Sequence, residues 1–144
     1  MKPPPSLKKA MTPFPYSVER GAPLAEARQV MDQYRVRHLP VTQGHELVGI
    51  ITDRDLRSAL ALPMNRRVVS NLTVKDLYVS DAYVVDLNEP IETVLLTMAA
   101  RQIGSALVTR QGRLAGVFTA VDACRSFGEY IEETFPRPDG DEAA

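Results

Sequence analysis

The sequence predicts an α+β fold made of two copies of one strand-helix-strand-strand-helix unit. Three observations support this prediction. Residues 16–55 align without a gap on residues 83–122, at an offset of 67 residues. In each copy a proline is followed by apolar residues at helical spacing, which predicts an amphipathic helix. Behind each helix, two β-branched runs flank a turn that contains glycine, which is typical of a β-hairpin.

The repeat contains ten identical pairs, where average composition gives roughly two or three by chance. The pairs are Tyr16/Tyr83, Val18/Val85, Pro23/Pro90, Met31/Met98, Val41/Val108, Thr42/Thr109, Leu47/Leu114, Gly49/Gly116, Thr52/Thr119 and Asp55/Asp122. A buried core conserves only apolar character between copies. The polar pairs Thr52/Thr119 and Asp55/Asp122 therefore indicate a further role.

The elements of the first unit follow from local signals. Residues 1–6 contain three consecutive prolines and predict a disordered lead-in, so the first unit spans residues 7–62. Its first helix begins behind Pro23, and its hairpin consists of residues 39–42 and 47–51. A second helix begins after Thr52, where the spacing of apolar residues becomes helical again.

The same order recurs in the second unit. Residues 63–73 are the predicted linker, and residues 74–127 form the second unit, with its hairpin at 106–109 and 114–118. Residues 128–144 are predicted to form a short helix that ends near Phe135, followed by a frayed acidic tail.

Composition excludes several functional classes. Lys and Arg total 17 and Asp and Glu total 18, so no net basic charge attracts nucleic acid, and nucleic-acid binding is not expected. No apolar run approaches the ~20 residues that span a bilayer. The Pro-rich start is unlike a signal peptide, so we expect a cytoplasmic protein that does not bind membranes. Two histidines and one cysteine form no metal-ligand pattern, and no catalytic constellation is present, so the chain is expected to be neither a metalloprotein nor an enzyme.

The motifs of both copies resemble one known family. The first copy reads Leu39-Pro40-Val41 and then Leu47-Val48-Gly49-Ile50-Ile51-Thr52-Asp53-Arg54-Asp55, and the second reads Leu114-Ala115-Gly116-Val117-Phe118-Thr119-Ala120-Val121-Asp122. Lys9-Ala10-Met11-Thr12-Pro13 and Asp76-Leu77-Tyr78 precede the two copies. Over residues 7–127 the chain resembles a cystathionine β-synthase-type (CBS) domain pair, also called a Bateman module, here as a small stand-alone protein.

The resemblance implies a fold, an assembly and a function. The two β-α-β-β-α repeats are expected to pack through their sheets with pseudo-two-fold symmetry, and two chains to form a homodimer, a disc of four CBS motifs. The implied function is regulatory or energy-sensing, with AMP, ADP or ATP as ligand in clefts between the motifs. A regulated partner protein is implied but not identified.

The resemblance also assigns residues to two sites. The first site comprises Thr52, Asp53, Arg54, Asp55, His38, Leu39, Pro40 and Val18, and the second comprises Thr119, Asp122, Ser105, Ala106, Leu107 and Val85. Asp53-Arg54 and Arg37-His38 stand where the second copy has Ala120-Val121 and Gly104-Ser105. Because a guanidinium binds phosphate oxygens, the first site is predicted to suit a phosphorylated ligand better.

Two alternatives remain open. Thr-x-x-Asp after a strand is also the pattern of a helix capping box, in which both side chains only stabilise the helix. The chain is then a ligand-free dimerisation or scaffold domain. A sensor of S-adenosylmethionine or of another nucleotide is the second alternative.

Overall fold

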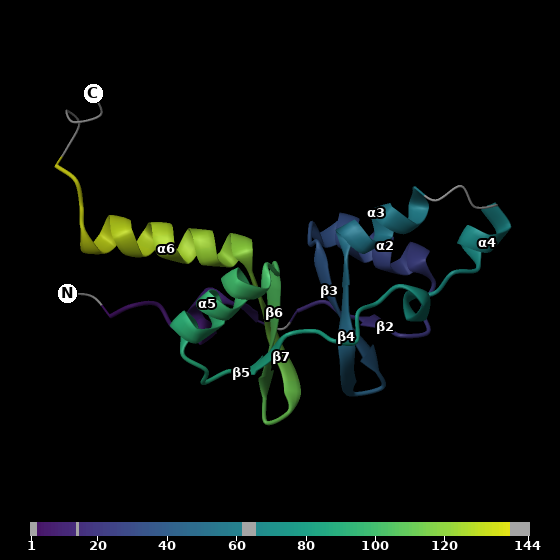
Figure 1. The fold of residues 1–144 in the computed structure, drawn as a ribbon, viewed down its shortest axis with the longest axis horizontal. Coiled ribbons are helices and arrows are strands. Elements are labelled where there is room, and N and C mark those ends of the chain that lie inside the picture. Colours follow the sequence, from purple (N-terminus) through teal and green to yellow (C-terminus); the bar gives the residue numbers. More distant parts are fainter. Residues whose placement is uncertain (1–2, 14, 62–65, 139–144) are drawn as a thin grey trace.

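A computed structural model describes residues 3–13, 15–61 and 66–138, and its ribbon shows two similar halves (Figure 1). The first unit consists of β2 (Val18–Glu19), α2 (Leu24–Tyr34), β3 (His38–Gln43), β4 (Glu46–Thr52) and α3 (Asp53–Leu60). The second consists of β5 (Val84–Asp86), α5 (Ile91–Arg101), β6 (Ser105–Arg110), β7 (Arg113–Thr119) and α6 (Ala120–Thr134). The predicted α+β class and the β-α-β-β-α order of each unit are confirmed.

Each unit contains a sheet with the same topology. In the first unit β2 runs parallel to β3, and β3 forms an antiparallel hairpin with β4. In the second unit β5, β6 and β7 repeat this arrangement. The register shifts between Val41 and Thr42 and between Val108 and Thr109, so even the β-bulge occurs twice. The helices of each unit cover one face of its sheet (Figure 1).

The segments that precede the units pack on the opposite unit. We call residues 7–13 the first lead segment, which contains α1 (Leu7–Ala10) and β1 (Thr12–Pro13). β1 pairs with β7 of the second unit, and Leu7 and Met11 are buried in the second core. The second lead segment, residues 74–80, contains the 3₁₀ helix η1 (Val74–Asp76) and packs on the first core. Neither core is complete without a segment that precedes the other unit.

The identical pair Gly49/Gly116 is explained by this exchange. A Cβ on Gly49 would overlap the Val79 carbonyl oxygen and lie 2.7 Å from the Tyr78 ring. A Cβ on Gly116 would lie 2.8 Å from the Thr12 carbonyl oxygen and also overlap Met11. Both glycines therefore provide room for the backbone of the opposite unit's lead segment.

The two units meet through their sheets. Ile50 of β4, Leu107 of β6 and Val117 of β7 form a small buried cluster between the two main cores. This cluster lies where the two hairpins face one another, so the sheets pack together as expected.

Some boundaries differ from the sequence predictions. The second unit's last helix does not stop near Phe127 and restart, because α6 is continuous from Ala120 to Thr134. The predicted linker contains α4 (Arg66–Ser70), and Thr73 forms a bridge with Pro23. Residues 1–2 of the lead-in, residues 62–65 and residues 139–144 of the tail lie outside the described residues.

Candidate functional site

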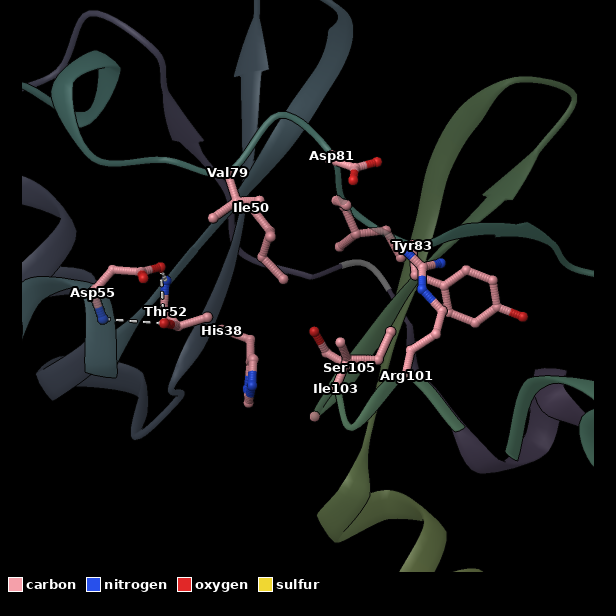
Figure 2. Close-up of a pocket in the computed structure, with 13 residues that line it drawn as sticks. His38, Ile50, Thr52, Asp55, Val79, Asp81, Tyr83, Arg101, Ile103 and Ser105 are labelled. Atoms are coloured by element: carbon pink, nitrogen blue, oxygen red, sulfur yellow. Dashed lines mark hydrogen bonds between the residues drawn. The ribbon is translucent and has the colours of Figure 1, made fainter. Parts of the chain in front are cut away.

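A cavity of about 210 Å³ lies between the two units (Figure 2). The first unit contributes residues of β3, β4 and α3, the second contributes residues around β6, and the segment between the units forms another wall. The lining residues are His38, Ile50, Thr52, Asp55, Val79, Asp81, Ala82, Tyr83, Arg101, Ile103, Gly104, Ser105 and Leu107. Its volume is below the ~300–1,000 Å³ of most small-molecule sites.

Thr52 and Asp55 occupy the N-terminus of α3 at one side of the cavity (Figure 2). Asp55 Oδ2 accepts hydrogen bonds from the Thr52 N–H and from Thr52 Oγ1, each at 2.9 Å. The Asp55 N–H donates in return to Thr52 Oγ1 at 3.2 Å. The capping box is therefore formed, but it uses only one oxygen of the carboxylate. No described residue donates to Asp55 Oδ1, so this oxygen can accept hydrogen bonds from a ligand.

The same box occurs twice more among the residues that the structure describes. Thr119 and Asp122 cap α6, and Thr73 and Asp76 cap η1 with a bond of 2.8 Å from the Thr73 N–H to Asp76 Oδ2. Asp76 is exposed and does not line the cavity. Capping and ligand binding are therefore compatible, and location distinguishes Asp55 from Asp76.

The side of the cavity opposite Asp55 provides a positive charge and an aromatic ring. Tyr83 and Arg101 lie there together, with the Arg101 Cζ 5.3 Å from the centroid of the Tyr83 ring (Figure 2). This is a cation–π contact that keeps a guanidinium beside the cavity. Ile103, Gly104 and Ser105 complete this side, next to His38 of the first unit.

His38 lies at the junction of the two units. A Cβ on Gly104 would lie 3.4 Å from His38 Nε2, so the absent side chain leaves room for the imidazole. Burial lowers the pKa of His38, and the Arg37 guanidinium acts in the same direction, while the Asp55 and Asp122 carboxylates oppose both. His38 is therefore a neutral imidazole at pH 7, able to donate from one nitrogen and accept at the other.

The two predicted sites do not form two separate groups in the structure. His38, Thr52 and Asp55 of the first set and Ser105 and Leu107 of the second line the same cavity. The other apolar members lie in the protein interior: Val18 and Leu39 in the first core, Val85 and Ala106 in the second, and Pro40 buried in β3. The cavity thus combines the capped Asp of one unit with the strand edge of the other.

The charged residues beside Asp55 have other surroundings. Asp53 Oδ1 lies 2.7 Å from Arg28 Nη1, and Asp53 Oδ2 lies 2.9 Å from Arg57 Nε. The hydrogen bond from Arg28 lowers the pKa of Asp53, which is therefore a carboxylate that joins α2 to α3. Arg54 is exposed and does not line the cavity.

Several lining residues were not predicted from the sequence. Asp81 and Tyr83 come from the segment before β5, Arg101 is the last residue of α5, and Ile103 lies between α5 and β6. The identity of Tyr16 and Tyr83 was a usable signal for Tyr83. Arg101 gave no such signal, because Tyr34 stands at the equivalent position of the first copy.

Two features are absent from the described residues. They contain no group of three or more His, Cys, Asp or Glu side chains that could hold a metal ion. Within the same part of the chain, no helix is long and apolar enough to cross a membrane.

Comparisons with known proteins agree with this architecture. L-aspartate semialdehyde sulfurtransferase of Methanocaldococcus jannaschii is 29% identical over 124 residues, which are 85% of this chain and 23% of that protein. The chain thus spans about a quarter of the length of this curated relative. A putative acetoin utilization protein (AcuB) of Vibrio cholerae superposes with a TM-score of 0.78 at 20% identity, covering 94% of this chain and 100% of that one.

A second solved structure contains ligands. The CBS domain pair of protein MJ0100, in complex with 5′-methylthioadenosine and S-adenosyl-L-methionine, superposes with a TM-score of 0.77 at 25% identity. The match covers 88% of this chain and 98% of that one. The sequence profile of the CBS domain matches residues 7–62 and again residues 74–129. The chain therefore belongs to the CBS domain family and contains a pair of these domains.

Proposed function

We propose that this CBS domain pair is a regulatory module that binds an adenosine-containing ligand in the cavity between its two units. One observation carries the proposal: Asp55 lines that cavity, and its capping box uses only Oδ2, so that Oδ1 has no donor among the described residues. A carboxylate that is fixed in this way suits the two adjacent hydroxyls of a ribose. The ligands of the similar CBS pair of protein MJ0100, both of them adenosine derivatives, support the same ligand class.

Among adenine nucleotides, the charges on the lining favour AMP over ADP and ATP. Arg101 supplies a guanidinium, which suits a single phosphate. Asp55 and Asp81 contribute two carboxylates to the same lining, and these repel additional phosphates. S-adenosylmethionine carries both a carboxylate and an ammonium group, and is the alternative ligand that this mixture of charges also fits.

The ligand would regulate by changing how the units pack. It would contact α3 of the first unit and β6 of the second, so its binding free energy acts on their relative arrangement. If the units have two relative arrangements, the ligand can shift the equilibrium between them only by the difference in its binding free energy for each. In this proposal the module is not catalytic, and its readout is the activity of a partner protein or of another part of a longer chain.

The test is calorimetric titration with AMP, ATP, S-adenosylmethionine and 5′-methylthioadenosine. We expect binding to the unaltered chain and a loss of at least about tenfold in affinity for Asp55→Ala, because one charged hydrogen-bond acceptor is removed. Asp76→Ala is the matched control, since it removes the same capping box outside the cavity and should leave affinity unchanged. If no ligand binds at millimolar concentration, the ligand-free scaffold is correct.

We also propose that the chain forms a homodimer through α6. Phe127, Ile131 and Phe135 recur every four residues and are 64%, 38% and 61% exposed. Such a contiguous apolar face is unusual on a monomer and is typical of an interface. Sedimentation velocity should find a dimer for the unaltered chain and a monomer for Phe127→Ser. Leu60→Ser, an exposed leucine on α3, is the control, and a dimer that survives Phe127→Ser contradicts this assignment.

A further inference from the structure

The repeat defines a second position, related by the 67-residue offset to the cavity around Asp55. In this position Asp122 replaces Asp55 at a helix N-terminus, Tyr16 replaces Tyr83, and Tyr34 replaces Arg101. The two positions therefore have the same scaffold. They differ in what surrounds the carboxylate and in what lies opposite to it.

Both oxygens of the Asp122 carboxylate already have partners. Asp122 Oδ2 accepts hydrogen bonds from the Thr119 N–H at 3.0 Å and from Thr119 Oγ1 at 3.1 Å, as in the first box. Asp122 Oδ1, the counterpart of the free Asp55 oxygen, lies 3.0 Å from Arg125 Nη2. Asp122 is 4% exposed, so a ribose would have to displace a charged partner from a buried carboxylate.

Arg125 bonds two parts of the fold although its side chain is 52% exposed, and it has no counterpart in the first unit. Its Nη2 also donates to the Ala10 carbonyl oxygen, at 3.4 Å, and Ala10 belongs to the first lead segment. The equivalent residue of the first unit is Ser58, which cannot form an ion pair with Asp55. Arg125 thus occupies the carboxylate that remains available in the first unit.

The opposite side of the second position is also altered. The rings of Tyr16 and Tyr34 stack with centroids 3.5 Å apart and planes inclined by 12°. Their facing surfaces contact one another, whereas Tyr83 faces a guanidinium at the cavity. An adenine that stacked between Tyr16 and Tyr34 would first have to separate the rings.

We propose that the Arg125–Asp122 ion pair and the Tyr16–Tyr34 stack close the second position, so that each chain binds one adenosine-containing ligand. The inference rests on the proposed function and names the residues that set its stoichiometry. Arg37, the counterpart of the lining residue Gly104, is the feature of the second position that favours an anion. AMP is therefore the strictest test of closure, because Arg37 can attract its phosphate and so favours binding at the second position.

The experiment counts AMP sites by calorimetry and then opens the second position. The unaltered chain should bind one AMP. Asp55→Asn should lose at least about tenfold in affinity and show no measurable site at concentrations chosen so that such a loss abolishes the signal. Adding Arg125→Ser and Tyr34→Arg to Asp55→Asn removes the ion pair and the stack and gives the second position the first position's residues at these two places, and should restore one site. Asp122→Asn in that triple variant should abolish the site again. Circular dichroism and the melting temperature establish that each variant is folded.

The outcomes separate this inference from the proposed function. If the unaltered chain binds no AMP, S-adenosylmethionine or 5′-methylthioadenosine, the proposed function fails. Two sites per unaltered chain, or a residual site in Asp55→Asn that Asp122→Asn removes, would overturn the closure of the second position. A folded triple variant that regains no site would also overturn it. In that case the Arg125–Asp122 ion pair and the Tyr16–Tyr34 stack would not be the cause of the missing binding.

Discussion

At the scale of single residues, surroundings rather than motif decide what an aspartate does. Asp55, Asp76 and Asp122 form the same capping box with a threonine three residues earlier. Asp76 is exposed, Asp122 is buried against Arg125, and Asp55 is half-buried at a cavity with one oxygen free. A carboxylate can bind a ligand only if its hydrogen-bonding capacity is not already used, and this distinguishes Asp55 from the other two.

The histidine at the junction of the units gives the protein a predictable response to pH. Because burial lowers the pKa of His38 below its ordinary value of 6.5, the unfolded chain binds its proton at a higher pH than the folded chain does. The contribution of neutral His38 to the free energy of unfolding should therefore be complete above about pH 6.5. It should be lost as the pH decreases through the lower pKa of the folded state. Urea titrations at about pH 8 and about pH 5 measure this change.

Two variants identify the group that is responsible. His38→Asn should reduce the loss of stability between the two pH values, since the buried imidazole is removed. His45→Asn should behave like the unaltered chain, because His45 is exposed in the turn between β3 and β4. Equal pH dependence in the unaltered chain and in His38→Asn would show that another group accounts for it.

At the scale of elements, the hairpins depend on close approach of the lead segments. Gly49→Ala places a methyl group against the Val79 carbonyl and the Tyr78 ring, so β4 and the second lead segment must separate. We expect a loss of about 1–3 kcal/mol in the free energy of unfolding, measured by chemical denaturation.

A glycine in open space is the control for that substitution. A Cβ on Gly128 in α6 would meet nothing within 4 Å, and glycine is a poor helix former. Gly128→Ala should therefore stabilise the protein by about 0.5–1 kcal/mol. If both substitutions had the same sign, close approach would not be the reason for Gly49.

At the scale of the whole molecule, the exchanged lead segments make the two units one cooperative structure. Leu7 precedes the first unit in sequence but is 1% exposed in the core of the second. Leu7→Ala should cost about 2–5 kcal/mol, while Leu96→Ala, at a side chain 71% exposed on α5, should cost little. Circular dichroism and tyrosine fluorescence should report one coincident transition for both variants. Two separate transitions would show that the units unfold independently.

Local patterns of the sequence are sufficient for much of this protein. Helical spacing behind Pro23 and Pro90, and hairpin turns after each helix, predict the α+β class and the order of elements. Thr52 and Asp55 predict a helix start because the capping box spans only four residues. These features depend on neighbours in the chain, and the repeat supports each of them twice.

Other features were decided only by tertiary structure, because they join residues that are distant in sequence. Asp55 lines the same cavity as Gly104 and Ser105 because the two units pack face to face, and no local pattern encodes this. The exchange of lead segments has the same origin. The sequence by itself determined two equivalent units with two equivalent aspartates. Contacts between distant residues left one carboxylate oxygen free at Asp55 and paired its counterpart at Asp122 with Arg125.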